Sequence, residues 1–401
     1  MPNYQSPGVY VEDVPSAVRP IAGVGTSTAG FIGIVADNVT MPPIPGEFEK
    51  NDDGSLKTDE DGNLIPVLYE VAAAGEARFI TNWEDFKKNF GSDFEDGNRT
   101  LAHAVFGFLQ NGGTACWVIR VKSATGYSKA LEAFETIDEI ALVAIPGATD
   151  KPTQEELLTH CEKMKDRFAI LDGKQSSADK YTKNDITGTL RNANDGYGAV
   201  YFPWIKVNDP GQNEIAVPPS GHIAGIYARS DATRGVHKVP ANEVITGALG
   251  VEHRLSKAHQ DQLNPEGINV IRLFNGNVTV WGGRTWADPG TDAEWKYIST
   301  RRLMNYLRES IEDGMRWVVF EPNALGLWQK IRRNASAFLA NSWRDGALFG
   351  ATPEEAFYVK CDEETNPKAV RDLGQVVTEI GVAIVNPAEF VVFRISQMAG
   401  S

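Results

Sequence analysis

The chain has 401 residues, 42% of them hydrophobic, and a formal net charge of −14. That length predicts two or three domains. The strong acidity argues against a nucleic-acid-binding surface, which would carry clustered Lys and Arg. No apolar run approaches the roughly 18–20 residues of a membrane helix, so we expect no membrane insertion. The N-terminus also lacks the pattern of a signal peptide.

Residues 1–20 form a first arm, which we predict to be a short strand with no pairing partner nearby in the sequence. An isolated strand leaves its backbone N–H and C=O groups open to another sheet, including a sheet of a neighbouring copy. The alternative is that the arm completes the sheet of its own subunit. The predicted pairing residues are Val9, Tyr10, Val11, Glu12 and Val14.

Residues 21–66 contain a flexible stretch, a strand and an insertion. The stretch 22–30 is small and Gly-rich, and it leads into a predicted strand at 31–35. Residues 38–66 then break the pattern, with seven acids against two lysines between Glu47 and Gly62. Asp-Gly turn signals within this segment predict an exposed acidic loop or hairpin. We find no internal repeat anywhere in the chain.

From residue 100 to 285 the pattern is typical of an α/β domain. A helix is predicted at 101–109, and a second helix is opened by Thr153 with Glu156 at capping-box spacing. A strand before and a strand after this second helix predict a βαβ unit with a right-handed crossover. The predicted strands are 115–120, 141–146, 168–172, 199–204 and 268–272.

From about residue 286 the order changes to α+β. The predicted elements are a helix at 300–313 stopped by Gly314, a strand at 316–320, a long helix at 323–344, a helix restarted at Thr352 with a second capping box, and a strand at 375–385. Residues 389–401 form a second terminal strand arm, for which the same two pairing alternatives hold. Its predicted pairing residues are Phe390, Val391, Val392, Phe393 and Ile395.

One charged cluster stands out in this acidic chain. Between Pro322 and Arg344 there are four basic residues and no acid. They are either a solvated helix face or a cationic stripe directed at an acidic protein surface, where charge complementarity sets register and specificity. The four residues are Lys330, Arg332, Arg333 and Arg344.

Motifs for catalysis or cofactor binding are missing. The sequence has no phosphate-binding loop, no dinucleotide fingerprint and no His-Glu-x-x-His pair. The cysteines at 116, 161 and 361 are scattered and odd in number, which predicts reduced buried thiols in a protein made in the cytosol. Ser220 is the best enzyme-like position, but a serine capping a helix explains it equally simply. We therefore expect no enzyme, cofactor or metal site.

Six segments taken together resemble the contractile tail-sheath family of phages, R-type pyocins and extracellular contractile injection systems. Each segment is a weak signal alone, but they follow the family order over essentially the whole chain. Residues 38–66 have no counterpart among them. The matching segments are 6–14, 20–28, 218–229, 280–285, 320–323 and 386–390.

The resemblance implies an α/β plus α+β fold. Residues 21–285 would form an outer α/β domain, subtilisin-like but without a catalytic triad, and 286–388 an inner domain facing a tube. The two arms would exchange strands with neighbouring copies. The four basic residues would face the tube, and Gly23, Gly25 and Gly30 would act as a hinge.

The function implied by the resemblance is structural. Copies of the chain would stack as sixfold rings around an inner tube and contract to drive the tube through a target envelope. Further expected partners are baseplate and terminal cap proteins, with sister sheath proteins as additional candidates. Assembly is expected in the bacterial cytoplasm, with release as part of a phage tail or tail-like particle. The alternatives are a non-contractile capsid or filament subunit, or a subtilisin-like or esterase-like hydrolase that uses Ser220.

Overall fold

The computed structural model describes residues 20–92, 94–175 and 181–391. The chain divides into two compact units. The large unit comprises residues 24–308 together with the chain from 385 onward, and the small unit comprises residues up to 23 together with 309–384. The sequence analysis placed a boundary at 285/286, whereas this division falls inside a helix, α8 (Ile298–Gly314).

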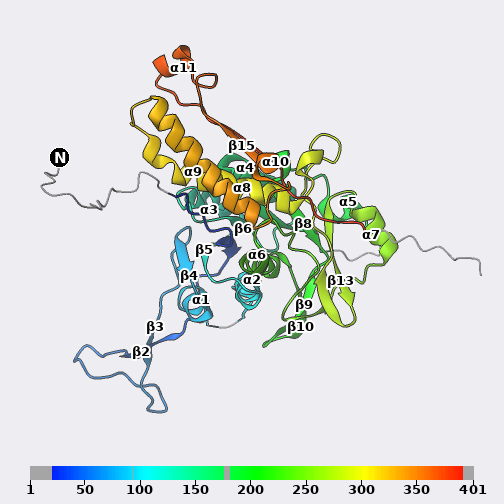
Figure 1. Cartoon of the computed structure of the whole chain (residues 1–401). Helices are drawn as coiled ribbons and strands as arrows, with labels where there is room; N and C mark the ends of the chain where they lie inside the picture. The colour runs from blue at the N-terminus through cyan, green and yellow to red at the C-terminus, as the bar shows by residue number, and fades with distance from the viewer. Residues whose placement is uncertain (1–19, 93, 176–180, 392–401) are drawn as a thin grey trace, which may run out of the picture. The chain divides into compact units, whose positions relative to one another are not determined.

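The large unit is built on a nine-stranded mixed sheet (Figure 1). Its middle strands pair in parallel and both ends of the sheet are antiparallel. All six strands predicted between 31 and 272 are confirmed. In spatial order the strands are β11 (Glu243–Val244), β14 (Asn277–Val280), β13 (Ile268–Phe274), β8 (Gly198–Phe202), β7 (Phe168–Asp172), β6 (Leu142–Ala144), β1 (Ala29–Ile34), β5 (Cys116–Val121) and β4 (Ala77–Ile80).

Helices cover both faces of this sheet, and a hydrophobic core lies on each face. One core is closed by α1 (Trp83–Phe90), α2 (Arg99–Gln110) and α6 (Ser220–Arg234), and the other by α3 (Tyr127–Phe134) and α4 (Lys151–Met164). Central strands are buried on both sides, which is why they read as continuous apolar runs. The predicted βαβ unit is confirmed, because α4 joins the parallel neighbours β6 and β7.

Helices α2 and α6 approach each other very closely. A Cβ atom at Gly221 would lie 2.3 Å from the carbonyl oxygen of Ala104, and one at Gly225 would lie 2.4 Å from that of Phe108. No larger residue fits at either position, so the Gly-x-x-x-Gly spacing in α6 serves helix packing.

The remaining elements of the unit are a three-stranded sheet of β10 (Asn213–Val217), β9 (Ile205–Asp209) and β12 (Ala248–Val251), and two short helices, α5 (Lys183–Thr187) and α7 (Lys257–Leu263).

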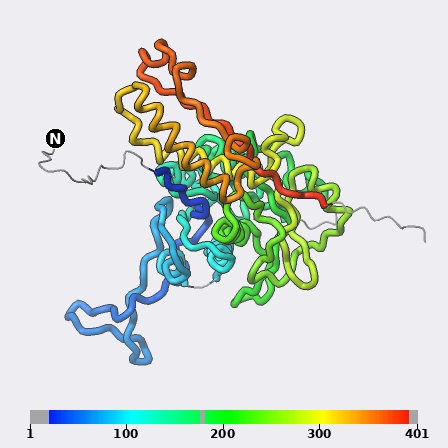
Figure 2. Tube along the Cα trace, in the orientation of Figure 1, coloured from blue at the N-terminus to red at the C-terminus, as the bar shows by residue number. Residues whose placement is uncertain are grey.

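The predicted acidic hairpin is confirmed between β2 (Pro43–Phe48) and β3 (Pro66–Leu68), and Figures 1 and 2 show it extending from the rest of the large unit. The prediction of no internal repeat was wrong. Two eight-residue units, 49–56 and 57–64, share Asp-Gly at their fifth and sixth positions and Leu at their eighth. Each unit folds into one turn, closed by the bridges Lys50–Leu56 and Thr58–Leu64. Two copies with so few identities are hard to detect in the sequence.

The two turns close on each other through a ring of backbone hydrogen bonds. The Lys57 N–H donates to the Glu49 carbonyl (2.9 Å), the Ile65 N–H to Lys57 (3.0 Å) and the Glu49 N–H to Ile65 (2.8 Å). We call residues 49–65 the acidic knob. Leu56 and Leu64 are exposed to solvent and form no hydrophobic core. The backbone hydrogen bonds therefore hold the knob together.

The small unit is centred on α9 (Leu325–Arg344), and the predicted buried stripe of this helix is confirmed. Leu327, Trp328 and Ile331 form its core with Cys361. The other elements are α10 (Pro353–Ala356), β15 (Phe357–Lys360), α11 (Lys368–Asp372) and β16 (Glu379–Val382). Strands β15 and β16 pair with each other as a separate two-stranded sheet.

Four local predictions in the helix and strand pattern need correction. Residues 316–318 form a 3-10 turn instead of a strand, closed by the Val318 N–H donating to Met315 (2.9 Å). Asp150, not Thr153, caps α4, since its carboxylate accepts from the Thr153 N–H. Thr352 makes no side-chain cap, and the predicted strand 375–385 shortens to the four residues of β16.

The cysteine prediction is confirmed, because all three thiols are free and buried. In the part of the chain that the structure describes, no helix is long and apolar enough to cross a bilayer.

Candidate assembly sites

The C-terminal arm leaves the large unit at Phe390. This residue and Val391 are 71% and 69% exposed, so they do not fold back onto the subunit. Just before them, Glu389 is tied to the large unit by a salt bridge to Arg284. The other predicted pairing residues of both arms lie outside the described residues. They are Val392, Phe393 and Ile395 in this arm and Val9, Tyr10, Val11, Glu12 and Val14 in the first.

The four basic residues of α9 lie mainly on its solvent side. Arg332, Arg333 and Arg344 are exposed, and Lys330 is partly buried. Arg344 donates to Asn341 (Nη1 to Oδ1, 3.2 Å), and none of the four forms a salt bridge with an acid of the described ranges. These cations therefore remain available to an external partner.

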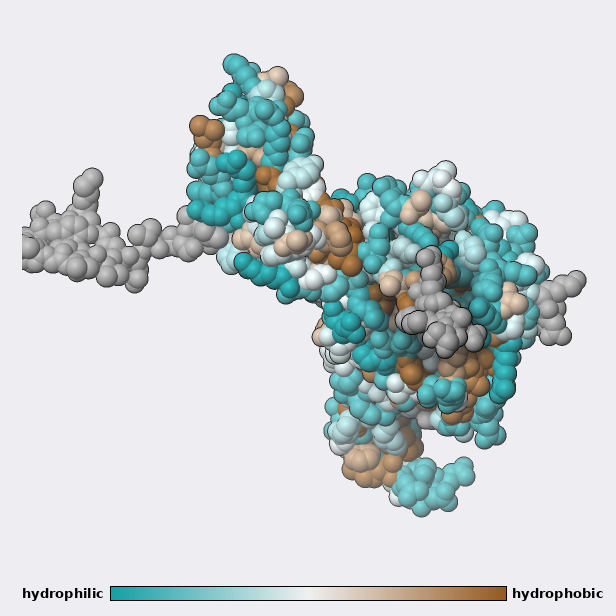
Figure 3. Space-filling model, turned by 45° about the vertical axis from the view of Figure 1, so that its right-hand side comes forward, coloured by the Kyte–Doolittle hydropathy of each residue, from teal (hydrophilic) through white to brown (hydrophobic). Residues whose placement is uncertain are grey.

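Large apolar side chains are also exposed on the small unit, which the sequence analysis missed. Phe320 is fully exposed and has a positive φ of 69°, which is unusual for a bulky residue. Such exposed apolar surface marks protein–protein contacts. Figure 3 shows hydrophobic residues at several places on the face in view. The exposed apolar residues of this unit include Val319, Leu325, Phe349, Tyr358 and Leu373.

The three glycines proposed as a hinge occupy different environments. Gly23 and Gly25 are exposed, and a Cβ at Gly25 would meet nothing within 4 Å. Gly30 lies in β1, where a Cβ would come within 2.8 Å of the Phe134 ring. A residue in a central strand does not rotate freely, so any hinge here depends on Gly23 and Gly25.

Both ends of the Gly23–Gly25 stretch are fixed. On one side Ile21 is buried and packs so closely on Gly314 of the small unit that a Cβ there would lie 2.7 Å from its side chain. On the other side, in the large unit, the Thr26 hydroxyl donates to Asp231 (2.6 Å) and its carbonyl accepts from Arg302 (2.9 Å). The Gly23–Gly25 stretch is thus short and held at each end.

Ser220 does not have the surroundings of a catalytic serine, and the prediction that it caps a helix was also wrong. It is the first residue of α6 after Pro219, and its hydroxyl donates to the Asp172 carboxylate (2.7 Å). Asp172 also accepts from the backbone N–H groups of Ser220 (2.9 Å) and Gly147 (3.0 Å). The pair therefore ties α6 to the end of β7.

The nearest histidine in sequence is not a base for Ser220. Burial lowers the pKa of His222 to about 3, so its ring is neutral, and its Nδ1 has no hydrogen-bond partner among the described residues. Burial raises the pKa of Asp172 to about 6 despite the hydrogen bonds from Gly147 and Ser220. A serine bonded directly to a carboxylate lacks the serine–histidine contact of a hydrolase.

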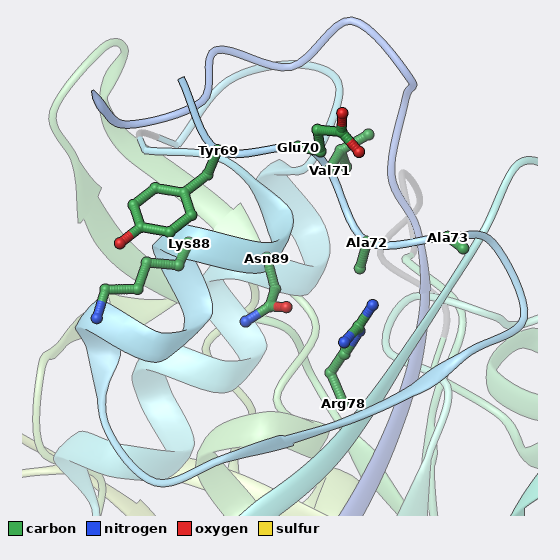
Figure 4. Close-up of a pocket in the computed structure, with 8 residues that line it drawn as sticks. All are labelled: Tyr69, Glu70, Val71, Ala72, Ala73, Arg78, Lys88 and Asn89. Atoms are coloured by element: carbon green, nitrogen blue, oxygen red, sulfur yellow. The ribbon is translucent and has the colours of Figure 1, made fainter. Parts of the chain in front are cut away.

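A pocket of about 480 Å³ lies beside α1 and β4 (Figure 4). Arg78 and Lys88 give it cationic groups, and Glu70 gives it an anionic one. Arg78 is itself engaged, since its guanidinium donates to Glu76 (2.9 Å). The lining has no serine, cysteine or histidine. It is lined by Tyr69, Glu70, Val71, Ala72, Ala73, Arg78, Lys88 and Asn89.

Two family models match the chain in succession. The phage tail sheath protein central domain matches residues 121–286, and the phage tail sheath C-terminal domain matches residues 290–398. The chain belongs to the contractile tail sheath protein family. The two matches together span more than half of its length, and the family consists of structural proteins.

Two curated relatives of this sheath protein come from phages. The chain is 28% identical over 196 residues to the tail sheath protein of Burkholderia phage BcepMu, covering 47% of this chain and 40% of that protein. It is 31% identical over 199 residues to the tail sheath protein of Vibrio phage KVP40, covering 49% of this chain and 28% of that protein. The matched segments therefore span less than half of either relative.

Solved structures match over nearly the whole chain. The sheath complex of the extracellular contractile injection system PVC, in its contracted state, is 26% identical, with a TM-score of 0.77 and 99% of each chain covered. The contracted helical sheath of the anti-feeding prophage is 27% identical, with a TM-score of 0.73, covering 98% of this chain and all of that one. The expected mixed α/β architecture is confirmed by these matches.

Proposed function

We propose that this sheath protein is the repeating subunit of a contractile sheath, which polymerises as stacked sixfold rings around an inner tube. The observation that carries the proposal is the match to the PVC sheath over 99% of both chains. Contraction of the array then drives the tube through a target envelope. Its further partners are baseplate and cap proteins, with sister sheath proteins as candidates, and assembly takes place in the bacterial cytoplasm before release.

Strand exchange by the two arms connects the subunits. Two features support it: Phe390 and Val391 leave the large unit exposed, and the two-stranded sheet of β15 and β16 has room at its edges. A two-stranded sheet is marginally stable alone and gains from added strands. Each backbone hydrogen bond contributes about 0.5–1.5 kcal/mol, and several per arm, repeated in every subunit, hold the array together.

The tube contact is assigned to the basic face of α9. Its free cations suit an acidic partner surface, and exposed ion pairs are modest and salt-sensitive. An interface of this strength is able to release when the sheath contracts. Head-to-tail contacts that do not close on themselves generate a helical array. During contraction the subunits of this array would move nearly as rigid bodies from one packing to another.

Electron microscopy of the expressed protein tests this function. We expect hollow ribbed cylinders from the full chain, and folded but unassembled subunits from chains that lack residues 1–14 or 392–401. The second truncation ends after Val391 so that Glu389 keeps its contacts. Ordered cylinders from either truncation would contradict strand exchange. Smooth filaments or closed shells from the full chain would instead indicate the non-contractile alternative.

A further inference from the structure

The chain is fastened to the large unit at one residue before the C-terminal arm begins. After the small unit ends at Ile384, the chain returns to the large unit and reaches Glu389. The Glu389 side chain is 18% exposed and that of its partner Arg284 is 12% exposed. The next residue, Phe390, is 71% exposed. The change from anchored to free chain therefore occurs across a single peptide bond.

Glu389 is held by four side chains. Arg284 binds both carboxylate oxygens, Nε to Oε1 at 2.8 Å and Nη2 to Oε2 at 2.9 Å. Asn264 donates to Oε1 (2.7 Å) and the Tyr297 hydroxyl to Oε2 (2.9 Å), while Lys296 lies 3.4 Å from Oε2. A bidentate guanidinium–carboxylate pair with two further donors fixes both the position and the orientation of the carboxylate.

Arg284 is in turn connected to the centre of the large sheet. Its backbone N–H donates to the Asn269 side chain (2.7 Å), and Asn269 lies in β13. The Asn269 amide donates to the Val200 carbonyl in β8 (3.2 Å) and to the Arg284 carbonyl (2.7 Å). A force applied at Glu389 therefore passes through hydrogen bonds to two central strands.

This contact joins two distant segments of the sequence. Residues 280–285 and 386–390 are both among the six segments that resemble the family, and they are about a hundred positions apart. The structure brings them together through Arg284 and Glu389.

We propose that Arg284 and Glu389 form the root of the C-terminal arm, which fixes the direction of the arm and transmits the pull of the neighbouring copy into the large unit. The inference rests on the proposed strand exchange.

Glu389→Gln tests the root, because it removes the charge and keeps the shape. The matched control is Glu162→Gln, since Glu162 forms the same bidentate pair with Arg191 (2.7 and 2.9 Å) away from either arm. Hydrogen exchange of the full-length dilute subunit should be about ten-fold faster in Glu389→Gln at the amides of Arg284 and Thr285, which donate to the Asn269 side chain (2.7 Å) and to the Lys296 carbonyl (3.0 Å), and unchanged there in the control. Arg284→Lys, which keeps the charge but loses the paired geometry, should give an intermediate rate.

Assembly provides the second measurement. Electron microscopy should show few or short cylinders for Glu389→Gln and normal cylinders for Glu162→Gln. Unchanged exchange at Arg284 and Thr285, or faster exchange with normal cylinders, would overturn the root. If Glu389→Gln does not fold, Tyr297→Phe removes one hydrogen bond to the carboxylate and is measured in its place. Cylinders formed without residues 392–401 would overturn strand exchange, whereas the exchange rates would still report on the root.

Discussion

Arg302 and Asp231 form a bidentate ion pair whose side chains are only 3% and 5% exposed. The guanidinium also lies 4.7 Å from the centre of the Tyr227 ring, and it donates to the carbonyl of Thr26. The pair joins α6 and α8 and fixes the point where the chain enters the large unit after Gly25. It is the N-terminal counterpart of the contact between Arg284 and Glu389.

Asp231→Ala should destabilise the subunit by about 3–5 kcal/mol, because it leaves the Arg302 charge buried without a partner. Urea unfolding followed by fluorescence measures the loss. The matched control is Glu135→Ala, which removes a surface ion pair with Lys163 and should cost about 0–1 kcal/mol. Equal losses in the two variants would show that the buried pair has no special role.

The stability of the subunit should depend on the ionisation of Asp172. Because burial raises the pKa of this carboxyl to about 6, the native state holds the proton more tightly than the unfolded chain does. The stabilisation that this tighter proton binding gives the folded state is fully present below the ordinary pKa of about 3.9. It is lost as the pH rises through 6. Asp172→Asn stays neutral throughout.

Each pKa unit corresponds to about 1.4 kcal/mol, and the unfolded carboxyl is already about half ionised at pH 4. The stability of the natural protein relative to Asp172→Asn should therefore fall by about 2 kcal/mol between pH 4 and pH 8. Urea unfolding at intervals of pH measures the difference, and Asp138→Asn, at an exposed position, serves as the control. A difference that does not change with pH would contradict the buried ionisation.

Charge reversal on α9 should weaken binding to the inner tube. Lys330→Glu with Arg333→Glu removes two cations and adds two anions on the exposed face, so we expect about ten-fold weaker association at physiological salt, with a smaller difference at high salt. Co-sedimentation of sheath with tube measures it. The control is Arg316→Glu with Lys368→Glu, two exposed basic positions of the same unit outside α9. Unchanged binding after the first pair of substitutions would remove the tube-facing assignment.

The acidic knob should be dispensable for folding. Replacing residues 50–64 by Asn-Gly keeps the hydrogen bond from the Glu49 N–H to the Ile65 carbonyl and should change the free energy of unfolding by less than about 1 kcal/mol. Urea unfolding tests this, and Leu56→Ala with Leu64→Ala separates the exposed leucines from the turn. A loss of several kcal/mol would show that the knob supports the large unit.

Local patterns predicted most of the helices and strands because the pattern of each lies within a short stretch of sequence. The predicted strands β1, β5, β6, β7, β8 and β13 are mainly apolar runs, and α9 carries a buried stripe at helical spacing. The strand predicted at 316–320 was wrong for a physical reason. Its β-branched residues favour an extended chain, but among the described residues no strand lies beside it, and hydrogen bonds within the turn take over.

The sequence by itself determined the sheath family, the mixed α/β architecture and the basic face of α9, since these depend on order, spacing and composition. Only the tertiary structure decided which distant residues meet. It bonded Ser220 to Asp172 instead of a base, anchored Thr26 through Arg302 and Asp231, and joined Arg284 to Glu389. Contacts of this kind join residues that are at least 48 positions apart in the chain, and no local pattern encodes which distant residues will meet.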